Sequence, residues 1–377
     1  LALRMKKRDF IKVLGTGGLA LSGLAVAPAF AGCKNKDHGA SGRKIWAWVH
    51  PNENPDTAKT TDEWKWLFSE FNEWGITDVL LLTRKKDIID QVLPVAVEAD
   101  INLHAWIISL EYPDAAIMKH HPSWYVVNAK GESCIDKPAY INDYRWLCPS
   151  NPEVIEFMKT RVAELCSYNE VTGVHLDYIR YPDAVLAAFH RAKYDIPQDD
   201  LVHPQFDYCY CETCRKSFKQ TEGIDPFDLP DPLTDEKWLR FRLDVLTGLV
   251  NELYDTAHSN NKLLTAAVFP TPGISKFRVR QDWVNWKMDV IMPMIYQRYE
   301  GQPVEWIGQA TKEGVEALGG RIPLYSGLHL AQLSPEELKE ATLVSLRAGA
   351  SGVALFTGNK MNDYYRQCIN QALKSIL

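Results

Sequence analysis

One carboxylate stands where an apolar strand would otherwise continue. Asp177 lies in the run GVHLDYIRYP, residues 173–182, late in a segment whose composition predicts a buried strand. An unpaired charge in that position costs several kcal/mol, so the residue needs either a partner or a chemical role. A salt bridge to Arg180 is the purely structural alternative. We expect a catalytic role for Asp177, oriented by Arg180 and by His175, which the period of two places on the same inward face.

Aromatic and imidazole side chains recur near the ends of the predicted strands. The chain has 12 Trp and 16 Tyr, and such rings stack on the apolar faces of sugars while His and Arg bind the hydroxyl groups. Each ring alone is equally well explained by packing in the core, but their concentration around Asp177 favours a sugar site. The residues expected to bind substrate are Trp48, His50, His104, Trp106, His175, Arg180, Tyr296 and His329.

Hydrolysis of a glycosidic bond usually takes two carboxyl groups, about 5–5.5 Å apart for retention and about 6.5–9.5 Å apart for inversion. Asp177 would be the nucleophile or the general acid. Glu111, just beyond the third predicted strand, is the first choice for its partner, ahead of Asp183 and Glu300. Substrate assistance, in which an N-acetyl group replaces the protein nucleophile, stays open. None of these schemes requires a catalytic cofactor.

Extended apolar runs alternate with helical patterns, which is typical of β–α units around a parallel sheet. No glycine-rich phosphate loop follows the first run, where AWVHP stands at 47–51 instead, so a doubly wound nucleotide-binding sheet is disfavoured. We predict an α/β fold, a (β/α)8 TIM barrel over 44–377, with its chemistry at the carboxyl ends of the strands. The predicted strands cover 44–50, 77–83, 101–110, 173–179, 263–269, 288–296, 322–328 and 352–357, and an irregular Cys-containing insertion follows strand 4 at 181–232.

Two of the helices can be placed from local sequence patterns. Asn151 followed by Pro152 is a capping residue before a first-turn proline, and predicts a helix that leads into strand 4. A long amphipathic helix is predicted over 235–259.

Cysteines in the insertion form a second signal. Cys209, Cys211 and Cys214 lie close together in sequence, and with a fourth ligand they would suit a closed, structural zinc site. Cys148 is expected as the fourth ligand, because it and the insertion both belong to the strand-end face. The alternatives for that position are Cys134 and His203. Disulfide bonds are the competing interpretation, since an exported protein meets oxidising conditions.

The first residues have the pattern of an export signal. Residues 1–32 combine a basic start, an apolar stretch and small residues before Cys33. FAGC at 30–33 is similar to a bacterial lipobox, which would make Cys33 the lipidated first residue of the mature chain and 33–43 its tether. A plain cleaved signal with an incidental cysteine is the alternative. We therefore expect an exported protein, lipid-anchored in the cell envelope at its periplasmic or outer-membrane face.

Composition and charge exclude several classes of protein. With 46% hydrophobic and 24% charged residues, the chain is expected to fold around a large core. Its formal net charge is −6, and removal of 1–32 would leave about −10. A nucleic-acid partner is disfavoured because phosphate binding needs a basic surface. A neutral carbohydrate fits this charge better.

Several motifs together resemble a known family. GVHLDYIRYP at 173–182, LHAWI at 103–107, CPSNPEV at 148–154 and DVIMPMIY at 289–296 are similar, in that order, to the glycosyl-hydrolase-like family of "family 10 glycosylhydrolase" proteins. The resemblance covers most of the chain from about residue 44. It implies a (β/α)8 barrel acting on glycosidic bonds, with Asp177 as the main catalytic carboxylate. Members often have a second Asp directly after it, where this chain has Tyr178.

A further resemblance concerns the cysteines. CYCETCRKSF at 209–218 is similar to a segment of family 42 β-galactosidases, in which such thiols bind a structural zinc.

Two other functions compete with a glycoside hydrolase. A non-catalytic glycan-binding lipoprotein on a degenerate barrel is the main alternative, supported by the lack of an evident second carboxylate. A hydrolase of another bond, such as a deacetylase, would want a metal triad of His and Asp at the strand ends, and the spacing shows none.

Overall fold

The computed structural model describes residues 44–51, 59–358 and 362–375. The predicted export signal, Cys33 and the tether lie outside the described residues. No helix among the described residues is long and apolar enough to cross a membrane. The strands are β1 (Lys44–Val49), β2 (Ile76–Leu82), β3 (Asn102–Ile108), β4 (Gly173–Asp177), β5 (Leu263–Val268), β6 (Val290–Pro293), β7 (Tyr325–His329) and β8 (Gly352–Phe356).

All eight strands belong to one parallel sheet in the order β6-β5-β4-β3-β2-β1-β8-β7. The two edge strands meet through isolated parallel bridges, Ile291 to Leu324 and Met294 to Gly327, and we call this junction the β6–β7 seam. Pro293 has no N–H to give to a ladder there. Gly327 permits the close approach, because a Cβ at that position would lie 2.7 Å from the Pro293 carbonyl oxygen. The predicted (β/α)8 barrel is confirmed, with one loosely paired junction.

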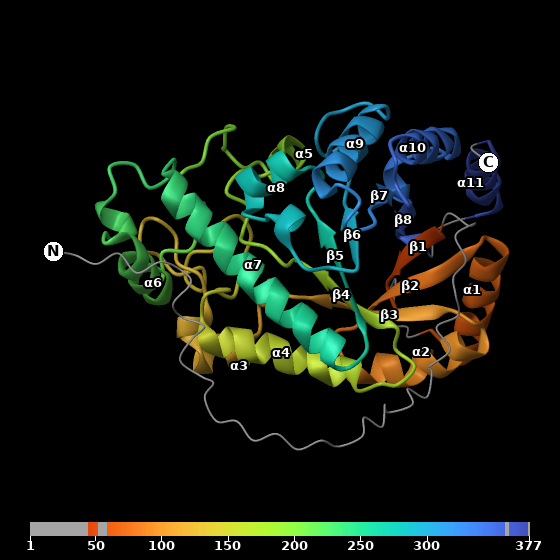
Figure 1. Ribbon diagram of the computed structural model, residues 1–377, viewed down its shortest axis with the longest axis horizontal. Coiled ribbons are helices and arrows are strands. Elements are labelled where there is room, and N and C mark those ends of the chain that lie inside the picture. The colour runs from red at the N-terminus through yellow and green to blue at the C-terminus, as the bar shows by residue number, and fades with distance from the viewer. Residues whose placement is uncertain (1–43, 52–58, 359–361, 376–377) are drawn as a thin grey trace, which may run out of the picture. The chain divides into compact units, whose positions relative to one another are not determined.

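Helices connect successive strands and cover the outside of the barrel (Figure 1). They are α1 (Thr61–Glu73), α2 (Lys86–Glu98), α3 (Ala115–His120), α4 (Pro152–Cys166), α5 (Ala188–Lys193), α6 (Glu212–Glu222), α7 (Glu236–Ser259), α8 (Pro272–Val279), α9 (Trp306–Leu318), α10 (Pro335–Arg347) and α11 (Asp363–Lys374). Short 3₁₀ turns lie at η1 (Pro122–Trp124), η2 (Pro226–Asp228), η3 (Trp283–Asn285) and η4 (Leu330–Gln332).

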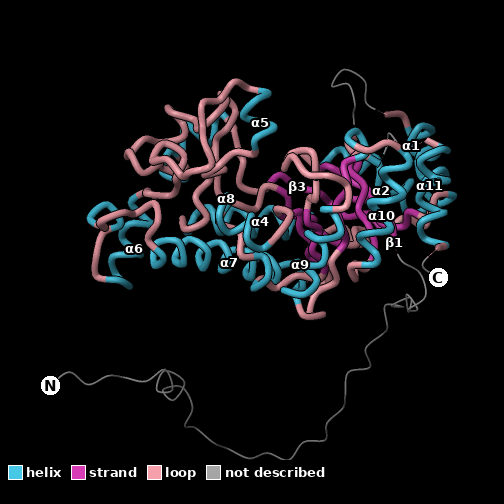
Figure 2. Tube along the Cα trace, turned by 90° about the horizontal axis from the view of Figure 1, so that it is seen from above, coloured by secondary structure: helices cyan, strands magenta, loops and turns pink. Residues whose placement is uncertain are grey.

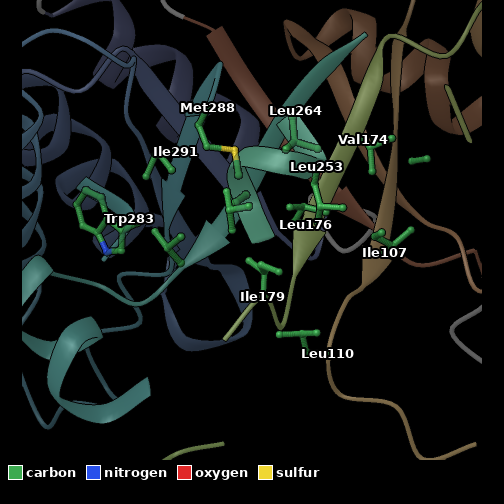
Figure 3. Packing of buried hydrophobic residues seen from close by; sticks show 14 of the residues in the cluster. Ile107, Leu110, Val174, Leu176, Ile179, Leu253, Leu264, Trp283, Met288 and Ile291 are labelled. Atoms are coloured by element: carbon green, nitrogen blue, oxygen red, sulfur yellow. The ribbon is translucent and has the colours of Figure 1, made fainter. Parts of the chain in front are cut away.

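Side chains of the strands alternate between two cores, as the period of two requires. On β4, Val174 and Leu176 face the helices, where they pack with Leu253 of α7 and Leu264 of β5 (Figure 3). A second, smaller cluster fills the inside of the barrel and includes Trp46, Trp48, Leu80, Trp106, Met292 and Tyr325. His175 also faces inward, because its ring contacts Trp48. The inward face of β4 therefore carries the polar residues that the sequence predicted there.

The helix starts follow from capping chemistry. Asn151 caps α4, its side-chain oxygen accepting the Glu153 backbone N–H at 2.9 Å, with Pro152 in the first turn. Asp235 caps α7 in the same way, accepting the Trp238 N–H at 2.7 Å. Both predicted helices are confirmed.

The insertion at 181–232 is more ordered than predicted. It contains two helices, α5 and α6, besides loops, and the loops gather around them on one side of the strands (Figure 2). α5 buries none of its six residues, and α6 buries only Cys214 and Phe218. A helix without buried positions, such as α5, leaves no helical period in the sequence, whereas Cys214 and Phe218 of α6 lie four residues apart on one face.

Candidate active site

A cavity of about 460 Å³ opens where the strands end. This is the end of a (β/α)8 barrel at which active sites are found. Of the side chains predicted to act or to bind substrate, the structure brings together in the cavity wall Trp48, His50, Trp106, Glu111, Asp177, Arg180, Tyr296 and His329.

Asp177 is the last residue of β4, and both of its carboxyl oxygens accept hydrogen bonds. Trp106 Nε1 on the neighbouring strand β3 donates to Oδ2 at 3.1 Å, and the backbone N–H of Tyr178 donates to Oδ1 at 2.7 Å. Tyr178 has a φ of 51°, a left-handed conformation that costs a non-glycine residue about 1–2 kcal/mol. Burial raises the pKa of Asp177 to about 6, against the lowering effect of these bonds and of the Arg180 charge. The carboxyl group is therefore protonated or ionised in comparable amounts near pH 6.

Arg180 pairs with a different carboxylate from the one that the sequence suggested. Its Nη1 lies 2.6 Å from Asp183 Oδ2, and the Tyr144 hydroxyl donates to the same oxygen. The guanidinium group also lies over the Trp146 ring, 4.6 Å from its centroid. Asp183 is held in this buried pair, whereas Asp177 receives its hydrogen bonds from Trp106 and from the backbone.

Glu111 is the second carboxylate of interest. It follows β3, whose Ile108 is in register with Asp177, and it forms a bridge with Trp146. Burial raises the pKa of Glu111, the charges of Arg180 and Arg84 lower it, and Asp177 is among the carboxylates that raise it. Glu111 and Asp177 thus share one cavity and one electrostatic environment.

Glu300, the remaining candidate, accepts two bonds from Arg278 Nη1, both 2.8 Å long. Like Asp183, it is held by an arginine.

The predicted aromatic residues surround Phe356, at the end of β8. The ring centroid of Phe356 lies 5.8 Å from that of His50, 6.3 Å from Trp106, 6.0 Å from Tyr296 and 5.0 Å from His329. The rings come from the ends of different strands, so they form one apolar wall with polar edges beside Asp177. Such a wall suits the alternating apolar and hydroxyl surfaces of a sugar.

Two predicted residues lie deeper in the barrel and are not part of the cavity wall. His175 Nε2 accepts from Trp48 Nε1 at 2.9 Å, and its Nδ1 lies 2.8 Å from Thr265 Oγ1. His104 lies 3.4 Å from Asp78 and against the Trp46 ring, with a centroid distance of 4.7 Å. Burial lowers the pKa of His175, so its ring is neutral. It contacts the cavity wall through its hydrogen bond with Trp48.

Sequence reasoning missed much of the outer wall. Tyr140 and Tyr144 come from the loop before α4, His190 and Tyr194 from the insertion, and Tyr299 from the loop after β6. None of these segments has a helix or strand period that would have placed its side chains. The density of tyrosines at 140–144 was the one available signal.

The four cysteines expected around a metal do come together. Cys148, Cys209, Cys211 and Cys214 are buried, with their sulfur atoms all within 4.8 Å of one another. Cys148 Sγ lies 3.5 Å from each of the other three. Tetrahedral Zn–S bonds of about 2.3 Å place sulfur atoms about 3.8 Å apart, whereas a disulfide needs about 2.05 Å. The arrangement fits a structural metal.

A buried ion cluster lies beside these cysteines. Asp207 Oδ1 lies 2.5 Å from Arg242 Nη1 and 2.8 Å from Arg280 Nη2, and all three residues are buried. Arg242 also donates to the Tyr208 carbonyl oxygen at 2.8 Å. The cluster joins the insertion to α7 and to the end of α8, and so holds the outer part of the cavity wall against the barrel.

The fold and the cavity define a (β/α)8 protein with a candidate site at the carboxyl ends of its strands. The chain belongs to the glycosyl hydrolase-like 10 family, whose model matches residues 68–343. The resemblance found in the motifs is therefore confirmed. No curated protein sequence matches the chain.

Solved structures share the fold at low identity. The β-galactosidase of the haloarchaeon Halorubrum lacusprofundi is 12% identical with a TM-score of 0.59. The match covers 88% of this chain and 57% of the β-galactosidase chain. The β-galactosidase of Marinomonas ef1 is 9% identical with a TM-score of 0.58, covering 88% and 59%. The β-galactosidase Gan42B of G. stearothermophilus is 10% identical with a TM-score of 0.56, covering 89% and 57%. The chain thus spans less than two thirds of these proteins. Family and fold together support a carbohydrate-active role.

Proposed function

We propose that the protein is a glycoside hydrolase in which Asp177 is the general acid. The observation that carries the proposal is the buried carboxyl group of Asp177 in the cavity wall, with a pKa of about 6. A general acid works best when its pKa lies near the working pH, since it must hold a proton and then give it up. Protonated Asp177 donates that proton to the glycosidic oxygen as the bond to the leaving group breaks.

Glu111 is the second carboxylate of the proposed reaction. Four carboxylates line the cavity in the part of the chain that the structure describes, and two of them, Asp183 and Glu300, are held by arginines. Glu111 either attacks the anomeric carbon or deprotonates the attacking water. The rings around Phe356 hold the sugar against the two carboxyl groups.

The general-acid role is tested with leaving groups of different acidity. We expect Asp177→Asn to lower kcat/KM by about 10²–10⁴-fold on glycosides with a poor leaving group. It should lower kcat/KM far less on a 2,4-dinitrophenyl glycoside, whose leaving group departs without a proton. Asp289→Asn is the matched control, because Asp289 precedes β6 at the opposite end of the barrel. Undiminished turnover in Asp177→Asn would contradict a catalytic role.

Glu111→Gln separates the remaining schemes. If Glu111 supplies the nucleophile or the base, its substitution abolishes turnover of every substrate. If turnover of N-acetylated substrates survives in Glu111→Gln but not in Asp177→Asn, the substrate's own acetamido group is the nucleophile.

A non-catalytic glycan-binding protein is the second candidate. It is favoured by the arginine pairing of Asp183 and Glu300, which withdraws two of the four cavity carboxylates in the described part of the chain from acid–base chemistry. Binding of a glycan by the wild-type chain with no turnover on any panel would support this candidate over the hydrolase.

We further propose that the four-cysteine cluster holds a structural zinc. The buried sulfur atoms and their 3.5 Å separations match the donor set that zinc prefers. The ion would tie the loop before α4 to the insertion.

Export and lipid anchoring remain part of the proposal and rest on the sequence at 1–43. Metabolic labelling with a radioactive fatty acid in a bacterial host tests them. Label in the wild type that is lost in Cys33→Ser supports the anchor, and equal label in both contradicts it.

A further inference from the structure

Aromatic rings continue outward from the strand ends to the insertion. The Tyr299 ring centroid lies 5.7 Å from that of Tyr296 and 5.9 Å from that of His329. The ring centroid of Tyr299 lies 4.5 Å from that of His190. The His190 and Tyr194 rings are stacked, with centroids 6.4 Å apart and an interplanar angle of 12°. An unbroken row of rings therefore leads from the inner site to α5 and the residue that follows it.

The outer members of this row face the cavity, where Tyr194 is exposed and His190 and Tyr299 are half-buried. Tyr299, His190 and Tyr194 all line the cavity, and Tyr194 is 47% exposed. Phe189, which is 44% exposed, stacks on Tyr299 at 4.9 Å and 25° and supports it. Large apolar side chains that stay exposed beside a binding cavity are typical of ligand contacts.

Charged groups of this outer region contact protein partners. Glu300 is neutralised by its two bonds to Arg278, and Lys193 lies 5.0 Å from the Tyr194 ring centroid. Burial lowers the pKa of His190, so its ring is neutral and offers both a donor and an acceptor. Flat rings with neutral hydrogen-bonding groups match an uncharged, hydroxyl-rich ligand.

We propose that Tyr194, His190 and Tyr299 form an outer subsite for a second, neutral sugar unit, next to the unit held beside Asp177. The proposal rests on the proposed glycosidase function and names its substrate class: an oligo- or polysaccharide rather than a monoglycoside. The cavity of about 460 Å³ is within the range of about 300–1,000 Å³ that is usual for pockets holding drug-sized ligands.

Binding measurements on a full-length variant with strongly reduced turnover test the subsite. Calorimetric titration of Asp177→Asn with cello-, xylo-, β-1,3-gluco-, galacto- and chito-oligosaccharides of one to six units gives affinity against length. We expect affinity to rise when a second unit is added in at least one series. Tyr194→Ala in the same background should weaken binding of the longer sugars about tenfold and leave the single unit unchanged.

Two controls isolate the ring. Tyr194→Phe keeps the stacking surface and should retain the gain with length. Tyr364→Ala removes a similarly exposed tyrosine of α11 that does not line the cavity, and it should change no affinity. Thermal unfolding of each variant confirms that it is folded.

Length-independent affinity in every series, or equal loss on short and long sugars in Tyr194→Ala, would overturn the subsite. The outcome is distinguishable from failure of the hydrolase proposal. If affinity rises with sugar length and Tyr194→Ala removes that rise, the subsite is supported even if the wild type hydrolyses nothing. If the wild type hydrolyses a glycan but affinity does not rise with sugar length, the subsite alone is refuted.

Discussion

Asp177 is expected to destabilise the folded protein at neutral pH. Its pKa is raised from 3.8 to about 6 on folding. At about 1.36 kcal/mol per pKa unit, the ionised form costs the fold about 3 kcal/mol. Because the folded-state pKa is the higher one, stability is fully retained below about pH 4 and is lost as the pH rises through 6. Between pH 4 and pH 8 the loss amounts to about 2.5 kcal/mol.

Asp177→Asn removes this pH dependence at a small structural cost. The amide has one oxygen for the two donors, Trp106 Nε1 and the Tyr178 N–H, so one hydrogen bond worth about 1 kcal/mol is lost at every pH. The variant should therefore be about 2 kcal/mol more stable than the wild type at pH 8 and no more stable at pH 4.

Urea unfolding followed by tryptophan fluorescence at pH 4, 6 and 8 measures both stability curves. Asp289→Asn is the control. The Asp289 carboxylate is paired with His258, so its substitution should give no stabilisation at pH 8. Parallel curves for Asp177→Asn and the wild type, or a variant that is weaker at pH 8, would refute the reasoning.

Other substitutions probe the site and its support. Trp106→Phe removes the Nε1 donor and should raise the pKa of Asp177, which moves the alkaline limb of the kcat/KM profile to higher pH; a shift to lower pH would count against it. Purified protein should contain one zinc ion per chain by emission spectrometry, and Cys148→Ser should lose it together with thermal stability, whereas disulfides found by mass spectrometry would rule the site out. Asp207→Asn leaves Arg242 and Arg280 buried without their carboxylate, and should lower the free energy of unfolding by about 3–5 kcal/mol in denaturant. A decrease under about 1 kcal/mol would show that the cluster contributes little to stability.

The barrel and the inner site were predictable because they follow from strand periodicity. Alternation along β4 placed Asp177 inward, and the order of the strands placed it beside Trp106. The period of two does not show how deep in the barrel an inward-facing side chain lies. His104 and Trp106 face the same way, but two residues of strand span about 7 Å, so one lies in the barrel and the other reaches the cavity.

Partners of charged groups were less predictable. Arg180 pairs with Asp183 rather than with Asp177. Tyr178, between Asp177 and Arg180, has a left-handed conformation that the sequence does not signal. The outer wall was missed for a related reason. Tyr140 and Tyr194 lie in segments that are positioned by long-range contacts, and such contacts leave no local pattern.

The β6–β7 seam is the strand junction of the barrel with the fewest paired residues. Seven strand pairs form ladders of several residues, whereas the seam is held by isolated bridges. Amide hydrogens at the seam should therefore exchange faster than those of the other strands. Tyr296 follows β6 and His329 ends β7, so one ring of the site lies on each side of the seam. A ligand in contact with both rings would hold the two edges together, and its binding would slow exchange at the seam.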